Sequence, residues 1–121
     1  MEFCFDNNIP IYIQLVEQLK IYIISGELAP GQRLPSVREL AMQTKVNPNT
    51  MQKALAELEN LGLIYTERTN GKFVSRDKDS IAAYRREYAL QMSNRFFSDM
   101  QKIGFDKEQT KAFIDSLGGD E

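Results

Sequence analysis

Residues 36–58 read SVRELAMQTKVNPNTMQKALAEL, and this stretch predicts two consecutive helices. Ser36 and Glu39 have the spacing of a capping box, in which each side chain bonds the backbone N–H of the other residue. A second helix is expected to begin after Asn47, an N-cap residue, with Pro48 at its first position. Two helices joined by a short turn are typical of a helix-turn-helix.

The second of these helices has an unusual outward face. Its inward stripe is apolar and consists of Met51, Ala54, Leu55, Leu58 and Leu61. The outward positions of its first turns hold Asn49, Thr50, Gln52 and Lys53. A solvated helix more often carries glutamate and lysine pairs there, whereas asparagine and glutamine match the edge of adenine and threonine can contact phosphate. The pattern indicates a helix that reads duplex DNA, although Asn47 to Thr50 also suit simple capping and turn roles.

A helix before this stretch and a hairpin after it would complete a winged helix. Pro10 opens a first helix with one apolar face, which ends near Gly26. After Gly62, residues 63–66 and 72–74 favour β-structure, and the turn-forming residues 68–71 separate them. The expected contacts of this wing with phosphates or the minor groove come from Arg68, Asn70, Gly71 and Lys72, with Gly71 supplying a positive φ. The predicted fold class is mainly α with a small β-hairpin.

The charge of the chain is not that of a strongly basic nucleic-acid-binding protein. Fifteen Lys and Arg residues stand against 17 Asp and Glu residues, which gives a net charge of −2. The distribution is uneven, because residues 33–53 hold four basic residues and one acidic residue, and residues 68–78 hold the same balance. Two local positive clusters therefore coincide with the predicted helix-turn-helix and wing.

Enzymes, metal proteins and membrane proteins are disfavoured by what the sequence lacks. It has no histidine, a single cysteine, no phosphate-binding glycine loop and no carboxylate cluster with metal-ligand spacing. We therefore expect no catalysis, no metal and no cofactor. Cys4 is expected to be a small apolar side chain or part of a frayed end. No apolar run could span a bilayer. The first ten residues contain the acidic residues Glu2 and Asp6, whereas a secretion signal begins with a basic region that leads into an apolar stretch. A cytoplasmic protein is therefore predicted.

Longer runs of the sequence resemble the GntR family of bacterial transcription regulators. Residues 26–41 read GELAPGQRLPSVRELA and residues 46–55 read VNPNTMQKAL, and the resemblance covers roughly residues 10–76. The short remainder resembles the YtrA-like branch, which lacks the large effector domain of its relatives. The resemblance implies a homodimer that represses transcription by binding an operator with two-fold symmetry.

The resemblance also implies roles for individual residues. It makes Arg38 a DNA contact from the first helix of the pair and lets Ser36 add a phosphate bond. It makes four residues contacts of the recognition helix, namely Asn47, Asn49, Thr50 and Gln52. It makes the wing tip around Gly71 a groove or phosphate contact. The sequence departs from the family at Pro48 and Gln52, where arginine is frequent, so we expect a set of contacts that leans toward A·T pairs.

A separate helical segment is expected at residues 79–121, after a DNA-binding domain at residues 1–78. Its apolar residues recur at steps of three or four, and they are predicted to form a dimer interface: Ile81, Tyr84, Tyr88, Met92, Phe96, Met100, Ile103, Phe113, Ile114 and Leu117. Two helices cannot bury both of their apolar faces. The favoured interpretation is packing on a second chain by two-fold symmetry, and the alternative is packing on the winged helix of the same chain.

The expected partners follow from these elements. A dimer would hold two recognition helices about one DNA turn apart, roughly 34 Å, and so require a palindromic or nearly palindromic site. A small-molecule effector between two tails is possible but not indicated, because a tail of 43 residues offers little material for a pocket. The alternative function is a winged helix that serves as a protein-interaction or assembly module, since the fold alone does not dictate DNA binding.

Overall fold

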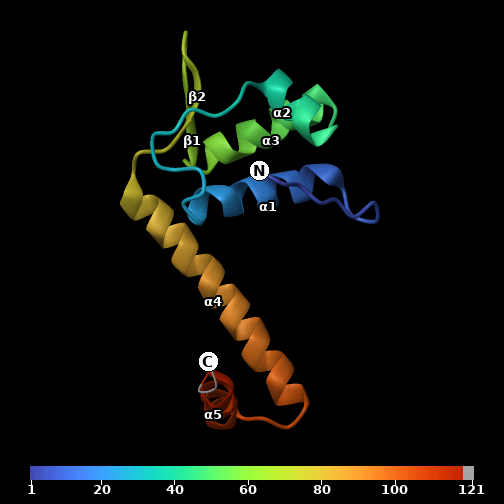
Figure 1. The fold of residues 1–121 in the computed structure, drawn as a ribbon, viewed down its shortest axis with the longest axis vertical. Helices are drawn as coiled ribbons and strands as arrows, with labels where there is room; N and C mark the ends of the chain where they lie inside the picture. Colours follow the sequence, from blue (N-terminus) through green and yellow to red (C-terminus); the bar gives the residue numbers. More distant parts are fainter. Residues whose placement is uncertain (119–121) are drawn as a thin grey trace. The chain divides into compact units, whose positions relative to one another are not determined.

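Seven helices and strands follow one another along residues 1–118, which are the residues that the structure, a computed structural model, describes (Figure 1). They are α1 (Ile11–Ile24), α2 (Val37–Thr44), α3 (Pro48–Asn60), β1 (Ile64–Glu67), β2 (Gly71–Val74), α4 (Lys78–Lys102) and α5 (Lys107–Gly118). The chain divides into two compact units between Tyr84 and Arg85, within α4. The predicted fold class, mainly helical with one hairpin, is confirmed.

Local capping explains where α2 and α3 begin. The Ser36 hydroxyl accepts a bond from the Glu39 backbone N–H at 3.1 Å, and the Glu39 carboxylate accepts one from the Ser36 N–H at 3.1 Å. This is the predicted capping box. Lys45 ends α2 with a left-handed φ of 59°, and Asn47 then caps α3 by accepting from the Asn49 N–H at 2.8 Å. The sharp turn between the two helices follows from these two residues.

The core of the first unit lies where α1 packs on α3 and α2 closes the bundle (Figure 1). Leu15 and Leu19 of α1 and Leu55 and Leu58 of α3 are almost completely buried. Burying each such side chain stabilises the fold by roughly 1.5–3 kcal/mol relative to leaving it exposed. The first helical turns of α4 join this core, because Ile81 is only 4% exposed and belongs to the same cluster.

The burial of Ile81 corrects one prediction. Ile81 was expected at a dimer interface, but its side chain is already packed within the core of its own chain. Tyr84 is half-buried against the same core, and its hydroxyl donates a 2.7 Å hydrogen bond to the Leu61 carbonyl. The first unit therefore extends past residue 78 to Tyr84 in the second turn of α4, and the exposed stripe begins after Tyr84.

The wing is wider than the predicted hairpin. β1 and β2 pair antiparallel, with Ile64 opposite Val74 and Glu67 opposite Gly71. The chain between α1 and α2 runs along the other edge of β2, where the Leu34 N–H bonds the Lys72 carbonyl and the Val74 N–H bonds the Gln32 carbonyl, both at 2.8 Å. Residues 32–34 therefore fix β2 from its second side, a pairing that the turn-like sequence at this point did not predict.

The N-terminal segment is not frayed, contrary to one of the expectations for Cys4. Gln14 and Gln18 of α1 bond the main chain of Asp6 and Cys4, each amide donating to a carbonyl and accepting from an N–H of the same residue. The Tyr22 hydroxyl bonds Glu2 in the same way. Side chains four residues apart share one face of a helix. These three side chains of α1 therefore hold every second residue of the extended N-terminal segment against the helix.

The second unit consists of the rest of α4, a turn and α5. Gly104, with φ of 100°, ends α4, and Asp106 and Gln109 form a reciprocal cap at 2.8 and 2.9 Å that begins α5. Thr110 is buried and Phe105 lies against Phe113, with ring centroids 5.7 Å apart. Although α4 has 25 residues, neither it nor another helix of residues 1–118 is long and apolar enough to cross a membrane.

Candidate nucleic-acid interface

The predicted recognition residues lie on the exposed side of α3. Met51, Ala54 and Leu55 are completely buried, and this inward stripe turns the positions between them to the surface. Asn49, Gln52 and Lys53 are exposed and Thr50 is half-buried. Three side chains with donors thus stand at the surface of the first two turns of α3, which is the part of a recognition helix that contacts base edges.

The N-cap of α3 and the surface of α2 frame this face. Asn47 is exposed, and its side-chain oxygen is used to cap the Asn49 N–H. The contact expected of Asn47 with DNA therefore falls to its amide nitrogen, which can donate to a phosphate. Arg38 is exposed on α2, two residues after the capping-box serine Ser36. These residues agree with their predicted places on the surface.

The wing tip is a tight turn between β1 and β2. Gly71 has φ of 103°, as predicted, a conformation that side chains other than hydrogen rarely adopt. Asn70 is held there by two bonds to Glu67, one from its backbone N–H and one from its side-chain amide. Arg68 is exposed at the same turn. Arg68, Asn70 and Gly71 are therefore gathered at one tip, as the sequence predicted.

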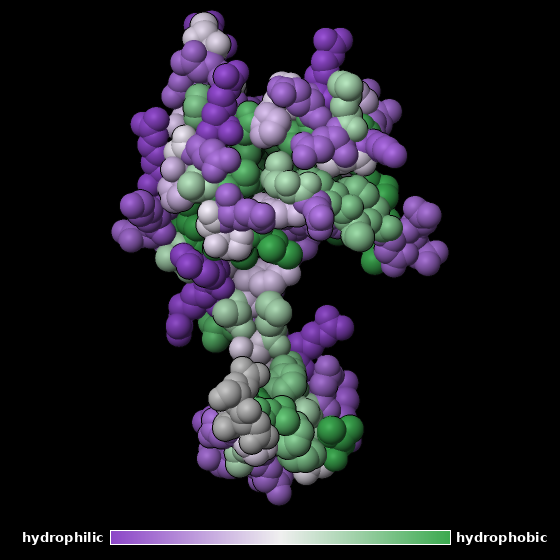
Figure 2. Space-filling model, in the orientation of Figure 1, coloured by the Kyte–Doolittle hydropathy of each residue, from purple (hydrophilic) through white to green (hydrophobic). Residues whose placement is uncertain are grey.

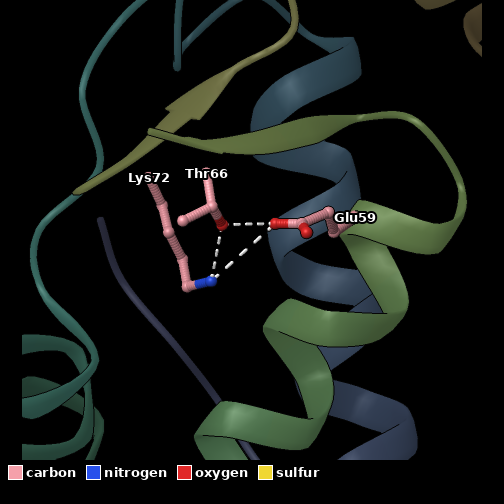
Figure 3. Close-up of polar contacts among 3 residues, drawn as sticks. All are labelled: Glu59, Thr66 and Lys72. Atoms are coloured by element: carbon pink, nitrogen blue, oxygen red, sulfur yellow. Dashed lines mark hydrogen bonds and ion pairs between the residues drawn. The ribbon is translucent and has the colours of Figure 1, made fainter. Parts of the chain in front are cut away.

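Lys72 behaves differently from the rest of the wing. Its side chain is only 17% exposed, and its Nζ donates to Thr66 Oγ1 at 2.9 Å and lies 3.8 Å from Glu59 Oε1 (Figure 3). Thr66 in turn donates to the same carboxylate at 2.5 Å. The network joins α3, β1 and β2, so it fixes the wing against the recognition helix.

This network corrects the expected role of Lys72 as a group free to contact DNA. Lys72 and Val74 lie on the same face of β2 because side chains alternate along a strand, and Val74 is buried toward the helices. The Lys72 side chain is therefore directed to Glu59 near the end of α3. The alternation of side chains along β2 could have predicted that Lys72 points inward. It could not have predicted the partner Glu59, which lies on α3.

A groove of about 380 Å³ separates the start of α2 from the wing. Its lining includes Ser36 on one side and Arg68, Asn70 and Gly71 on the other. A second hollow of about 340 Å³ lies at the helix-turn-helix turn, where Asn47 and Thr50 contribute to the lining. The structure therefore gathers most of the predicted DNA-binding residues in two places, the wing groove and the exposed start of α3, whereas Arg38 lies apart from both on α2. No group of acidic, Cys or His side chains within residues 1–118 could hold a metal ion.

The second candidate surface is apolar and lies on the second unit. Of the predicted interface residues, Tyr88 and Met100 are half-buried, and six are exposed: Met92, Phe96, Ile103, Phe113, Ile114 and Leu117. Leu90, which was not among the predicted interface residues, is exposed on α4 as well. Figure 2 shows hydrophobic residues gathered on the visible face of this unit, with polar residues at its rim.

Comparisons with known proteins agree with this geometry. Residues 11–74 match the family described as bacterial regulatory proteins, gntR family. The HTH-type transcriptional repressor YtrA of Bacillus subtilis (strain 168) is 33% identical over 115 residues, which are 94% of this chain and 88% of that protein. A GntR family transcriptional regulator from Listeria monocytogenes is similar in structure, with a TM-score of 0.85, 41% identity, and coverage of 93% of this chain and 98% of that chain.

Other similar structures contain DNA, and they are complexes of AraR with its operators. The DNA-binding domain of AraR in complex with operator ORX1 has a TM-score of 0.57 and 31% identity, and it covers 62% of this chain and 96% of that chain. The family and these relatives are DNA-binding transcription regulators and not enzymes. The match of the family to more than half of the sequence, together with a YtrA relative that spans nearly all of it, confirms the resemblance first seen in residues 26–55. The chain belongs to the GntR family of bacterial regulatory proteins, with relatives in the YtrA-like branch.

Proposed function

We propose that this protein is a homodimeric transcriptional repressor of the cytoplasm that binds a DNA operator with two-fold symmetry. The observation that carries the proposal is the exposed polar start of α3, which lies in a GntR-type winged helix. An AraR domain of the same fold binds its operator, which supports the same use of this surface here.

Base readout is assigned to α3. Gln52 and Asn49 each present a donor and an acceptor, which match the N6 and N7 groups of adenine in the major groove. Thr50 and Lys53 flank them and contact phosphate or the thymine methyl group. Because neither Gln52 nor Asn49 supplies the guanidinium that best recognises guanine, the half-site is expected to lean toward A·T pairs.

Contacts with the phosphate backbone are assigned to both sides of α3. Arg38 and Ser36 of the α2 region contact one stretch of backbone, and Asn47 adds a bond at the start of α3. Arg68, Asn70 and Gly71 contact the minor groove or its phosphates from the wing tip. These contacts set the position of the protein on the duplex, whereas α3 supplies the sequence preference.

The dimer is supported by the apolar residues of the second unit. Phe96 of α4 and Phe113, Ile114 and Leu117 of α5 are all more than 40% exposed. Large apolar residues that gather on one surface favour a protein partner, and a second copy offers the same surface by two-fold symmetry. The symmetry of the dimer would then repeat in the operator, with half-sites about one DNA turn apart.

Selection of bound sequences from a random duplex pool tests the proposal. The purified full chain is used at near-physiological salt, and sedimentation of the same preparation gives its oligomeric state. We expect an enriched motif made of two inverted half-sites and a sedimenting dimer. A dimer that enriches no sequence would instead favour a protein-interaction module, and an enriched single half-site would contradict the symmetric operator.

A further inference from the structure

Arg33 is a basic residue of the wing that belongs to neither helix of the helix-turn-helix. It lies in the segment before α2, where its backbone forms an isolated antiparallel bridge with Phe73 of β2. Its neighbour Leu34 donates to the Lys72 carbonyl at 2.8 Å. The backbone of Arg33 is thus fixed to the wing, while its side chain is exposed.

The guanidinium of Arg33 lies against the wing tip. Its Nε and one Nη are 3.5 and 3.7 Å from the position that a Cβ on Gly71 would occupy. Gly71 has a hydrogen at that position, so the side chain of Arg33 rests on the turn itself. Gly71 of the predicted DNA-binding wing tip is therefore in contact with the Arg33 side chain, a cation from outside the hairpin.

In the part of the chain that the structure describes, Arg33 has no carboxylate partner of the kind that Lys72 has in Glu59. Within residues 1–118, the carboxylates in ion pairs are those of Glu59, Asp99 and Glu108, and none of them pairs with Arg33. The positive charge of Arg33 contributes to lowering the pKa of Glu39, after the larger effect of the hydrogen bonds from Ser36. Glu39, however, uses its carboxylate to cap α2.

We propose that Arg33 binds a phosphate of the operator backbone beside the wing tip, in the role first expected of Lys72. Arg33 lines the same groove as Ser36, Arg68 and Asn70, which lies between the start of α2 and the wing. A guanidinium presents a planar set of donors that matches two phosphate oxygens, and it stays charged at any physiological pH. The inference rests on the proposed DNA-binding function.

The test measures operator affinity against salt concentration for the full chain and for Arg33→Ala, Arg33→Lys and Arg76→Ala. Arg76 is the matched control, because it is also exposed but lies over the Tyr65 ring, 5.9 Å from its centroid, and next to Gly31 at the other end of the wing. Thermal unfolding of each variant confirms that it folds. The DNA is the operator obtained from the random duplex pool.

We expect Arg33→Ala to reduce the slope of log affinity against log salt by about 0.9, the value for one lost phosphate contact. Arg33→Lys should keep the slope, since it keeps the charge, and Arg76→Ala should behave as the wild-type chain does. A slope unchanged in Arg33→Ala, or reduced equally in Arg76→Ala, would overturn this inference while leaving DNA binding intact. A wild-type chain without salt-dependent binding would overturn the proposed function and this inference together.

Discussion

The two units differ in what they do with their large apolar side chains. In the first unit, Leu15, Leu55 and Leu58 are completely buried, and even the first turns of α4 contribute Ile81 to the core. In the second unit, Phe96 and Leu117 remain exposed. The same distinction separates charged groups, because Lys72 has its partners within the chain and Arg38 is exposed. Groups satisfied within the chain explain the fold, whereas exposed groups that gather on one surface point to a partner.

The largest effect is expected in the core of the first unit. Leu55→Ala should lower the free energy of unfolding by about 2–5 kcal/mol, since it removes buried methyl groups and leaves a cavity. Leu117→Ala is the matched control and should cost less than about 0.5 kcal/mol when the chain is monomeric, because its side chain is already solvated. Urea denaturation at low protein concentration measures both, and equal losses would show that Leu117 is packed within the chain.

The next effect concerns the exposed surface of the second unit. Phe96→Glu combined with Leu117→Glu should give monomers, because two carboxylates would be buried without partners at the proposed dimer interface. Operator affinity should then fall about a hundredfold or more, since the two half-sites are no longer bound together. Sedimentation and operator titration measure the two losses.

A control for this variant exists on the first unit. Ile13 of α1 is also an exposed apolar residue, and Ile13→Glu should leave the chain dimeric. If the double variant stays dimeric, the interface lies on other residues, and the proposal for α4 and α5 is wrong.

The sequence predicts the helix-turn-helix well because its signals are local. Ser36 with Glu39 and Asn47 with Pro48 define the start of α2 and α3 within four residues of chain, and Gly71 marks the wing turn in the same way. Each of these rules needs only neighbouring residues, so one sequence suffices to apply it.

The sequence fails where a residue takes its partner from a distant element. Lys72 looks like a free basic residue of the wing until Glu59 of α3 is seen beside it. Ile81 fits the period of the exposed stripe on α4, and only tertiary packing assigns it to the core. Arg33 was visible as part of a basic cluster, but its contact with the wing depends on the pairing of residues 32–34 with β2.

A third, smaller effect separates two basic residues of the first unit. Arg38→Ala should weaken binding to all duplexes and reduce the salt slope by about 0.9, because an exposed cation is lost from the phosphate contacts. Lys72→Met should leave the slope unchanged, since that charge is already balanced by Glu59, and should cost about 1 kcal/mol of stability through the lost network. Titrations at several salt concentrations measure the slopes. A reduced slope in Lys72→Met would return Lys72 to the DNA-binding residues.

The smallest effect is a dependence of stability on pH that arises at the start of α2. Hydrogen bonds from the Ser36 backbone and hydroxyl, helped by the charge of Arg33, hold the pKa of Glu39 below its ordinary value of 4.5. A lowered pKa in the folded state means that the carboxylate stabilises the fold fully above that ordinary value, and that the stabilisation is lost as pH falls through the folded-state pKa.

Glu39→Gln keeps an oxygen that can accept from Ser36 but cannot titrate. The stability difference between the wild-type chain and Glu39→Gln should therefore shrink as pH falls below 4.5, as followed by thermal unfolding across that range. The cap of α5 has glutamine at the corresponding position, Gln109, so a difference that stays constant with pH would mean that the two caps work alike, without a contribution from charge.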